Sequence, residues 1–235
     1  MQPVACRYAP EVQTVPTLLG LFLPSRCAGC EAWGSGPWCK RCDGAIRWIG
    51  RDCCSQCGIP APAAAGTCRA CHYRRFAFVS ARSAAVYAGP AREAVKTFKL
   101  MGERRAARAL AARMVEGARA LGGGVVTWVP STRASEASRG FNPAEELARP
   151  LARSLRLPAH RLLTKQRDTL DSAGLSKEQR RVNLLHAFTA KRPIAGNVVL
   201  VDDIFTTGAT ADECAKALRR AGAREVSVVT FARAI

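Results

Sequence analysis

Val198-Val-Leu-Val-Asp-Asp-Ile-Phe-Thr-Thr-Gly-Ala-Thr210 is the stretch of this chain that decides its fold class. Its first four residues, Val198 to Val201, form a continuous aliphatic run, which is typical of a strand buried on both faces of a parallel sheet. Asp202 and Asp203 therefore fall at the carboxyl end of that strand, where ligands bind in open α/β sheets. The turn that follows leads into a helix predicted over residues 209–221.

The turn after the acidic pair has the composition of a phosphate-binding loop. Gly208 lets the backbone curl without a side-chain clash, and successive N–H groups can then surround a phosphate dianion. The positive end of the predicted helix adds to such a site. The alternative is an ordinary strand, turn and helix in which one Asp caps the helix. A cap accounts for one carboxylate but not for two carboxylates and the hydroxyls of Thr206, Thr207 and Thr210.

This segment resembles the phosphoribosyl pyrophosphate (PRPP) signature of type I phosphoribosyltransferases, which has a hydrophobic strand, an acidic pair and a Thr-Thr-Gly loop. The resemblance implies that the acidic pair meets the ribose hydroxyls, with Mg²⁺ nearby, and that the loop holds the 5′-phosphate. By position, Asp202 and Asp203 become the catalytic candidates. The 5′-phosphate would be bound by Thr206, Thr207, Gly208, Ala209 and Thr210.

Composition indicates a chain of two parts with a basic surface. Of the 235 residues 48% are apolar, which is ample for a buried core, and ten of the eleven cysteines precede residue 72. The formal net charge of +18 favours a polyanionic partner such as nucleic acid, with solvated arginine faces as the alternative. The excess positive charge lies before residue 196, so it avoids the phosphate-loop segment.

An apolar segment at Val15–Pro24 is too short to cross a membrane. It also lacks the preceding basic cluster and the small-residue cleavage site of a signal peptide. We therefore expect it to dock the cysteine-rich part onto the rest of the chain. The sequence predicts no membrane insertion and a cytoplasmic location.

Four Cys-x-x-Cys knuckles form two pairs, with spacers of eight and ten residues. This spacing predicts two structural zinc sites, because four thiolates complete a tetrahedron and leave no open position for water. We expect the knuckles to pair in sequence order, and a cross-braced pairing is the alternative. As ligands, Cys53 could replace Cys54, and His72 could replace Cys71. A disulfide framework would need an oxidising compartment, which nothing in the sequence indicates. The predicted ligands are Cys27, Cys30, Cys39, Cys42, Cys54, Cys57, Cys68 and Cys71.

Three tryptophans lie among the knuckles beside basic residues. Trp33, Trp38 and Trp48 could stack on the bases of a single strand. The interpretation we favour is that they form the small core around the metals, because so short a segment has few other large apolar groups.

The remaining strands and helices bring a second polar segment to the same edge of the sheet. We expect a strand over 77–88, helices ending near Met101 and over 104–120, and a buried strand over 125–129. The segment 131–142 is then a polar loop, closed by the N-cap of a helix at Asn142. In type I phosphoribosyltransferases the loop after the first core strand contacts pyrophosphate, and this segment has the corresponding position. Its N–H, hydroxyl and guanidinium groups also suit a diphosphate. The pyrophosphate-binding candidates are therefore Ser131, Thr132, Arg133 and Arg139.

From residue 17 onward the chain resembles the ComF family (ComFC/GntX-like). The resemblance is carried by Leu-Phe-Leu-Pro ahead of the cysteine knuckles, by Arg139-Gly-Phe-Asn142 and by the acidic-pair segment. Lys99 falls at the family's basic position before a glycine, which adds it to the catalytic candidates. One departure is Ser172 within Thr169–Leu175, where the family commonly has Gln; Arg180, Arg181 and Asn183 follow this segment.

The resemblance implies an α/β fold with a type I phosphoribosyltransferase-like parallel sheet flanked by helices, preceded by a small four-cysteine-type zinc module. The domains would be a tail and docking segment over 1–24, a double zinc-knuckle module over 25–75 and the phosphoribosyltransferase-like domain over 76–235. The implied activity is displacement of pyrophosphate from PRPP with Mg²⁺.

The family also implies a link to natural competence and DNA uptake, with single-stranded DNA and a helicase-type competence protein as partners. The alternative function is a non-catalytic adaptor that binds single-stranded DNA and uses PRPP or a nucleotide as a regulatory ligand.

Overall fold

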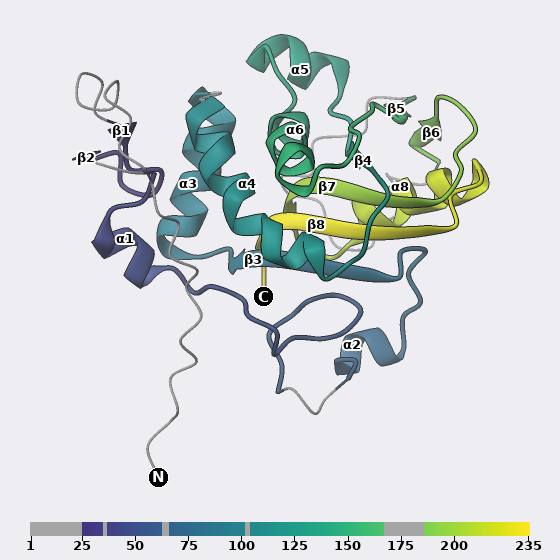
Figure 1. The fold of residues 1–235 in the computed structure, drawn as a ribbon, viewed down its shortest axis with the longest axis horizontal. Helices are drawn as coiled ribbons and strands as arrows, with labels where there is room; N and C mark the ends of the chain where they lie inside the picture. Colours follow the sequence, from purple (N-terminus) through teal and green to yellow (C-terminus); the bar gives the residue numbers. More distant parts are fainter. Residues whose placement is uncertain (1–24, 35–36, 63–65, 102–103, 167–185) are drawn as a thin grey trace.

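The computed structural model describes residues 25–34, 37–62, 66–101, 104–166 and 186–235. The predicted docking segment and the segment from Thr169 to Asn183 lie outside the described residues. The elements, in chain order (Figure 1), are β1 Ser25–Arg26, β2 Trp33–Gly34, α1 Lys40–Ala45, α2 Arg69–His72, β3 Ser80–Val86, α3 Gly89–Met101, α4 Arg104–Arg119, β4 Val125–Trp128, α5 Arg133–Arg139, α6 Pro143–Leu155, β5 Leu163–Lys165, β6 Phe188–Ala190, β7 Asn197–Phe205, α8 Ala209–Arg220 and β8 Glu225–Arg233.

The central sheet has four parallel strands in the order β3-β8-β7-β4. Helices α4 and α6 pack against each other and against the sheet, and they lie together with α3 above it in Figure 1. Because parallel strands place their carboxyl ends at one edge, the segments that follow β7 and β4 start from the same side of the sheet. The predicted parallel sheet flanked by helices is therefore confirmed.

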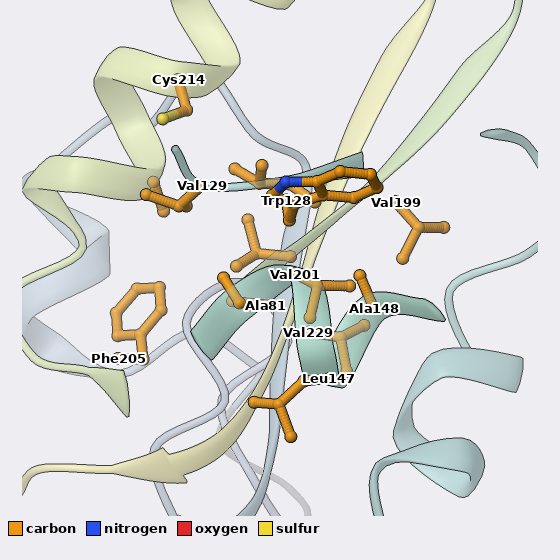
Figure 2. Close-up of a cluster of buried hydrophobic side chains, with 14 of the residues drawn as sticks. Ala81, Trp128, Val129, Leu147, Ala148, Val199, Val201, Phe205, Cys214 and Val229 are labelled. Carbon is orange, nitrogen blue, oxygen red and sulfur yellow. The ribbon is translucent and has the colours of Figure 1, made fainter. Parts of the chain in front are cut away.

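The predicted strand is buried on both faces. Val198, Val199, Leu200 and Val201 are each at most 1% exposed. Figure 2 shows Val199 and Val201 in one buried cluster with Trp128 of β4 and with Leu147 and Ala148 of α6. Burying an aliphatic side chain of this size stabilises the folded chain by about 1.5–3 kcal/mol. Packing of this run is thus a main reason for the fixed position of the β7 end.

A short helix replaces part of the predicted polar loop over 131–142. Thr132 is the N-cap of α5 and its Oγ1 accepts a hydrogen bond from the N–H of Ser135, 3.0 Å away. Gly140 ends the helix in a left-handed conformation with φ of 76°. The prediction of a loop was therefore wrong for residues 133–139, although a threonine N-cap and a glycine stop are sequence signals for a helix.

The cysteine-rich part packs directly on the sheet. The rings of Trp38 and Trp48 lie 6.1 and 6.4 Å from that of Phe231 in β8, and 5.9 Å from each other. Cys54, Cys57 and Cys71 of the second knuckle pair belong to the same continuous core as the sheet residues. Trp38 and Trp48 are thus packed, but against the core of the sheet and not in a separate core around the metals as predicted, and the prediction is wrong for Trp33, which is 65% exposed.

Within the described residues, no helix is both long enough and apolar enough to cross a bilayer.

Candidate functional site

The acidic pair lies in the last part of β7, beyond the end of the neighbouring strand β4. The β4 ladder stops at the pair Trp128 and Val201, whereas β8 stays paired with β7 up to Phe205. Asp202 and Asp203 therefore extend beyond β4 at the carboxyl edge of the sheet. The predicted edge is confirmed, but the strand is longer than the apolar run and includes both acids.

Lys99, near the end of α3, meets the second of these acids. Its Nζ lies 2.7 Å from Oδ2 of Asp203, and both side chains are largely shielded from solvent. Burial disfavours the ammonium, but the Asp203 carboxylate outweighs this effect and the pKa of Lys99 lies above its usual value. The ammonium is thus fixed beside the acidic pair, although Lys99 and Asp203 are 104 positions apart in the chain.

Asp202 is in a different environment, because successive side chains of a strand point to opposite faces. Its carboxylate lies on the side of Cys214 in α8, and its Oδ1 accepts a hydrogen bond from the N–H of Asp203 at 2.9 Å. Burial, reinforced by the charge of Asp203, raises the pKa of Asp202 to about 7. At neutral pH this carboxyl group can therefore gain or lose a proton when a cation or anion binds nearby.

The predicted phosphate loop is a tight turn that opens α8. Gly208 is the N-cap residue with φ of 77°, and a Cβ built there would lie 2.6 Å from Cζ of Phe205. Only glycine fits this position without a shift of the ring. Thr206 is exposed, Thr207 and Thr210 are partly exposed, and Thr207 Oγ1 accepts from the N–H of Ala209 at 3.3 Å. The threonine side chains of the turn are thus accessible at the positive end of a twelve-residue helix.

The pyrophosphate candidates divide into two groups. Ser131, Thr132 and Arg133 follow β4 directly and so lie at the same sheet edge as the acidic pair. Arg139 is at the other end of α5, about 9 Å along the helix axis from Arg133. The first three thus start from the same sheet edge as the acidic pair, and Arg139 lies at the far end of α5 from them; the binding role of all four stays a prediction.

Two further arginines, which are not among the predicted site residues, also belong to this region. Arg74 Nη1 donates a hydrogen bond to the carbonyl oxygen of Thr207 at 3.0 Å. Arg233 is 6% exposed, lies 4.6 Å above the ring of Phe205, and its Nη2 donates to Sγ of Cys57 at 3.3 Å. These contacts join residues 133 and 176 positions apart, and no local pattern indicates them.

The cysteines of the four knuckles form two clusters. In each cluster the four sulfur atoms all lie within 4.8 Å of one another, and the grouping is sequential rather than cross-braced. Cys53 and His72 belong to neither cluster. The cluster members are Cys27, Cys30, Cys39 and Cys42 in the first, and Cys54, Cys57, Cys68 and Cys71 in the second.

The donor set suits a zinc ion in both clusters. Sγ of Cys27 accepts from the N–H of Cys39 at 3.3 Å, and Sγ of Cys54 accepts from the N–H of Cys68 at 3.2 Å. Burial opposes thiolate formation at Cys27 and Cys54, but backbone N–H bonds outweigh it and lower both pKa values to about 6. Four sulfurs this close, with amides donating to them, provide the tetrahedral thiolate set that structural zinc requires.

A parallel α/β sheet with an acidic edge, preceded by two four-cysteine clusters, defines a zinc-ribbon α/β protein. A family described as "Double zinc ribbon domain" matches residues 18–72. The DNA utilization protein YhgH of Escherichia coli O157:H7 is 31% identical over 229 residues, covering 92% of this chain and all of the relative. Competence protein F of Haemophilus influenzae is 38% identical over 103 residues, covering 41% of this chain and 44% of the relative. The chain belongs to the ComF family, together with the YhgH proteins.

Solved structures with similarity to the chain include two enzymes of nucleotide metabolism. The allosteric regulatory enzyme of purine biosynthesis is 24% identical with a TM-score of 0.39, covering 58% of this chain and 30% of that one. The purine phosphoribosyltransferase from Pyrococcus horikoshii is 22% identical with a TM-score of 0.27, covering 53% of this chain and 68% of that one.

Proposed function

We propose that the chain binds PRPP at the carboxyl edge of its sheet and transfers the phosphoribosyl group to an acceptor with release of pyrophosphate. The observation that carries this proposal is the combination of two carboxylates, one ion-paired lysine and a glycine-capped turn at the end of one buried strand. Each part suits one chemical group of PRPP: the turn would bind the 5′-phosphate, and the carboxylates would accept hydrogen bonds from the ribose hydroxyls.

In the proposed reaction, the bond between ribose C1 and the pyrophosphate oxygen breaks while a bond from the acceptor to C1 forms. The electron pair leaves with pyrophosphate, so negative charge grows on the leaving group. Lys99 and the N–H and hydroxyl groups of Ser131, Thr132 and Arg133 are the groups of this chain that would stabilise that charge. The acceptor loses its proton to solvent or to a nearby base.

Magnesium fits the acidic pair by the chemistry of its donors. Two adjacent carboxylates with oxygen atoms at a sheet edge are ligands that Mg²⁺ prefers, and the ion usually shares them with substrate phosphates. Asp202 and Asp203 would hold it, and when bound it supplies neutralisation of diphosphate charge. Burial, and after it the charge of Asp203, raises the pKa of Asp202, and a cation bound beside it would favour the ionised carboxylate.

We also propose that both four-cysteine clusters bind Zn²⁺ and that these ions are structural. Both clusters present four sulfurs, and the double zinc ribbon match spans them. Metal analysis of the purified protein should find about two zinc ions per chain. A content well below two would contradict this part of the proposal.

The experiment follows pyrophosphate release from PRPP and Mg²⁺ in the presence of pools of nucleobases. The Lys99→Ala variant should lose at least about tenfold in rate, because a charge-assisted bond to the departing group is worth about 1.5–3 kcal/mol. Lys96→Ala is the matched control: Lys96 lies on the same helix, nearly one turn away, and pairs with Glu93 instead. Lys99→Arg keeps the positive charge and should retain more activity than Lys99→Ala.

Three outcomes separate the possibilities. Release that depends on Lys99 but not on Lys96 supports transfer at this site. PRPP binding without release with any base would leave a PRPP-responsive binding protein and contradict the enzyme. Equal rates for both lysine variants, with folding intact, would place the chemistry elsewhere.

A second candidate function, binding of single-stranded DNA, is favoured by one exposed tryptophan. Trp33 is 65% exposed in the first cluster region, and the Arg26 guanidinium lies 4.4 Å from its ring centroid. An exposed indole beside a cation is a platform on which bases stack. The names of the relatives, DNA utilization protein and competence protein F, agree with such a partner.

The affinity for a fluorescent oligothymidine strand should fall steeply with salt and drop further in Trp33→Ala. Binding that is absent or insensitive to both changes would remove this candidate.

A further inference from the structure

The segment that joins the second four-cysteine cluster to β3 lies along the phosphate loop. This joining segment, Tyr73–Phe78, makes three contacts there. Arg74 donates to the Thr207 carbonyl at 3.0 Å, and the N–H of Ala77 donates to Oδ1 of Asp212 in the first turn of α8 at 2.7 Å. Cε1 of Phe76 lies 3.1 Å from the position that a Cβ on Gly208 would take. The loop is therefore packed against the cysteine-rich part from one side.

The hydrogen bond from Arg74 fixes the direction of one peptide unit in the loop. The peptide between Thr207 and Gly208 is trans, so its carbonyl and its N–H point in opposite directions. With the carbonyl held toward Arg74, the N–H of Gly208 points away from it. The bond therefore determines which side of the loop presents this donor to an anion.

Stacked rings hold the Arg74 guanidinium in place. Its Cζ lies 4.4 Å above the ring of Phe76, which stacks at 4.6 Å on Phe78. Phe78 in turn meets Phe205, the residue before the loop, edge to face at 5.9 Å. A planar guanidinium stacked on an aromatic ring loses less side-chain freedom on making a hydrogen bond than a lysine would.

The second cluster itself is fixed to the sheet edge beside this segment. The N–H of Ala81 in β3 donates to the carbonyl of Gln56 at 2.7 Å. Gly58 approaches the same strand so closely that a Cβ would lie 2.6 Å from the Ala81 oxygen. On the other side, Arg233 bridges Cys57 and the ring of Phe205. The second cluster thus contacts β3 directly and, through Arg233, the ring of Phe205 just ahead of the phosphate loop.

We propose that Arg74 is a positioning residue of the phosphate loop, and that through it the second four-cysteine cluster keeps the loop in its anion-binding shape. This inference rests on the proposed function in one respect, that the ligand of the loop is a phosphate. It adds that the cysteine-rich part completes the PRPP site instead of serving as a detached module.

The test compares Arg74→Ala with Arg75→Ala in the full-length zinc-loaded protein. Both variants remove one positive charge, but Arg75 is exposed and is the next residue along the chain, so it controls for a general loss of charge. Titration calorimetry with PRPP and Mg²⁺ should show Arg74→Ala binding about five- to thirtyfold more weakly, as expected for the loss of one charge-assisted hydrogen bond. Arg75→Ala should bind within about twofold of the original chain.

A second readout needs no ligand. Amide hydrogen exchange of residues 206–211 should be faster in Arg74→Ala than in Arg75→Ala, because the loop peptide is no longer held. Arg74→Lys, which keeps the charge and one donor but not the planar fork, should fall between the two. Zinc content and the unfolding temperature of each variant show whether it is folded.

The outcomes distinguish the two proposals. If the original chain does not bind PRPP, the proposed function fails, and hydrogen exchange alone decides the role of Arg74. Unchanged exchange and unchanged PRPP affinity in Arg74→Ala would overturn the inference even if PRPP binds. Equal effects of the two alanine variants would also overturn it, since they would reflect charge and not loop geometry.

Discussion

Replacing Asp202 by asparagine should stabilise the protein, and increasingly so as the pH rises. The pKa of Asp202 is raised from its ordinary value of 3.8 to about 7 by burial and by the neighbouring charge of Asp203. The unfolded chain therefore releases the proton near pH 4, whereas the folded chain keeps it until about pH 7. Folding takes up a proton within this window, so the contribution of Asp202 is fully present below pH 4 and is lost as the pH rises through 7.

The size of this pH effect on stability follows from the pH range that can be used without protonating the cysteine ligands of the zinc clusters. Between about pH 5.5 and pH 8 the two titration curves predict a loss of about 2 kcal/mol in the original chain. Asparagine has the shape of the neutral acid, keeps an oxygen for the Asp203 N–H and carries no titrating proton. The unfolding temperature of Asp202→Asn minus that of the original chain should therefore increase by about 4–8 °C from the lower to the higher of these two pH values.

Calorimetric or fluorescence unfolding in zinc-containing, magnesium-free buffer measures this difference. Asp203→Asn is the matched control, since it removes the adjacent carboxylate but leaves the Lys99 ammonium without its partner. We expect that variant to be less stable than the original chain at about pH 8. A temperature difference for Asp202→Asn that is the same at both pH values would refute the reasoning, because it would mean that Asp202 is charged throughout.

Other substitutions test the loop, the core and a helix cap. Gly208→Ala should cost about 2–3 kcal/mol of unfolding free energy and weaken PRPP binding, because it combines a left-handed residue with a clash at Phe205; a wild-type urea midpoint would contradict the loop geometry. Trp38→Ala should cost about 3 kcal/mol and Trp33→Ala less than about 0.5 kcal/mol, which chemical denaturation can separate; equal costs would mean that the two rings are equally packed. Asn142→Ala should cost about 2 kcal/mol of unfolding free energy in thermal unfolding, since the Asn142 side chain accepts from two N–H groups of α6 and donates to the Val129 carbonyl. Asn142→Asp keeps the cap acceptor and should recover part of this stability.

The sequence predicts the sheet edge well because the signals there are local. The aliphatic run, the helix bounds 209–221 against Ala209–Arg220 in α8, and the capping role of Asn142 all depend on neighbouring residues. Spacing alone also identified both sets of cysteines, because a two-residue spacer is a local constraint on metal geometry. These parts could be predicted without knowing the tertiary structure.

The missed parts depend on contacts between distant segments. Nothing near Arg74 indicates a carbonyl of the phosphate loop as its partner, and nothing near Arg233 indicates a cysteine of the second cluster. Likewise, the composition around Trp33 does not differ from that around Trp38, yet only the latter meets the sheet. The α5 helix was missed for another reason: its serine, alanine and arginine residues fit a polar loop as well as a short capped helix.

The strand order β3-β8-β7-β4 has a consequence for how the chain folds during synthesis. Strands β3 and β7 are neighbours of β8 but not of each other, and β8 is made after both. While the ribosome is still translating the earlier strands, β3 has no partner in the sheet, and Trp38 and Trp48 lack the Phe231 ring on which they pack. We therefore expect the cysteine clusters to capture their metal first on the nascent chain, and the sheet to close around β8 only as the final step.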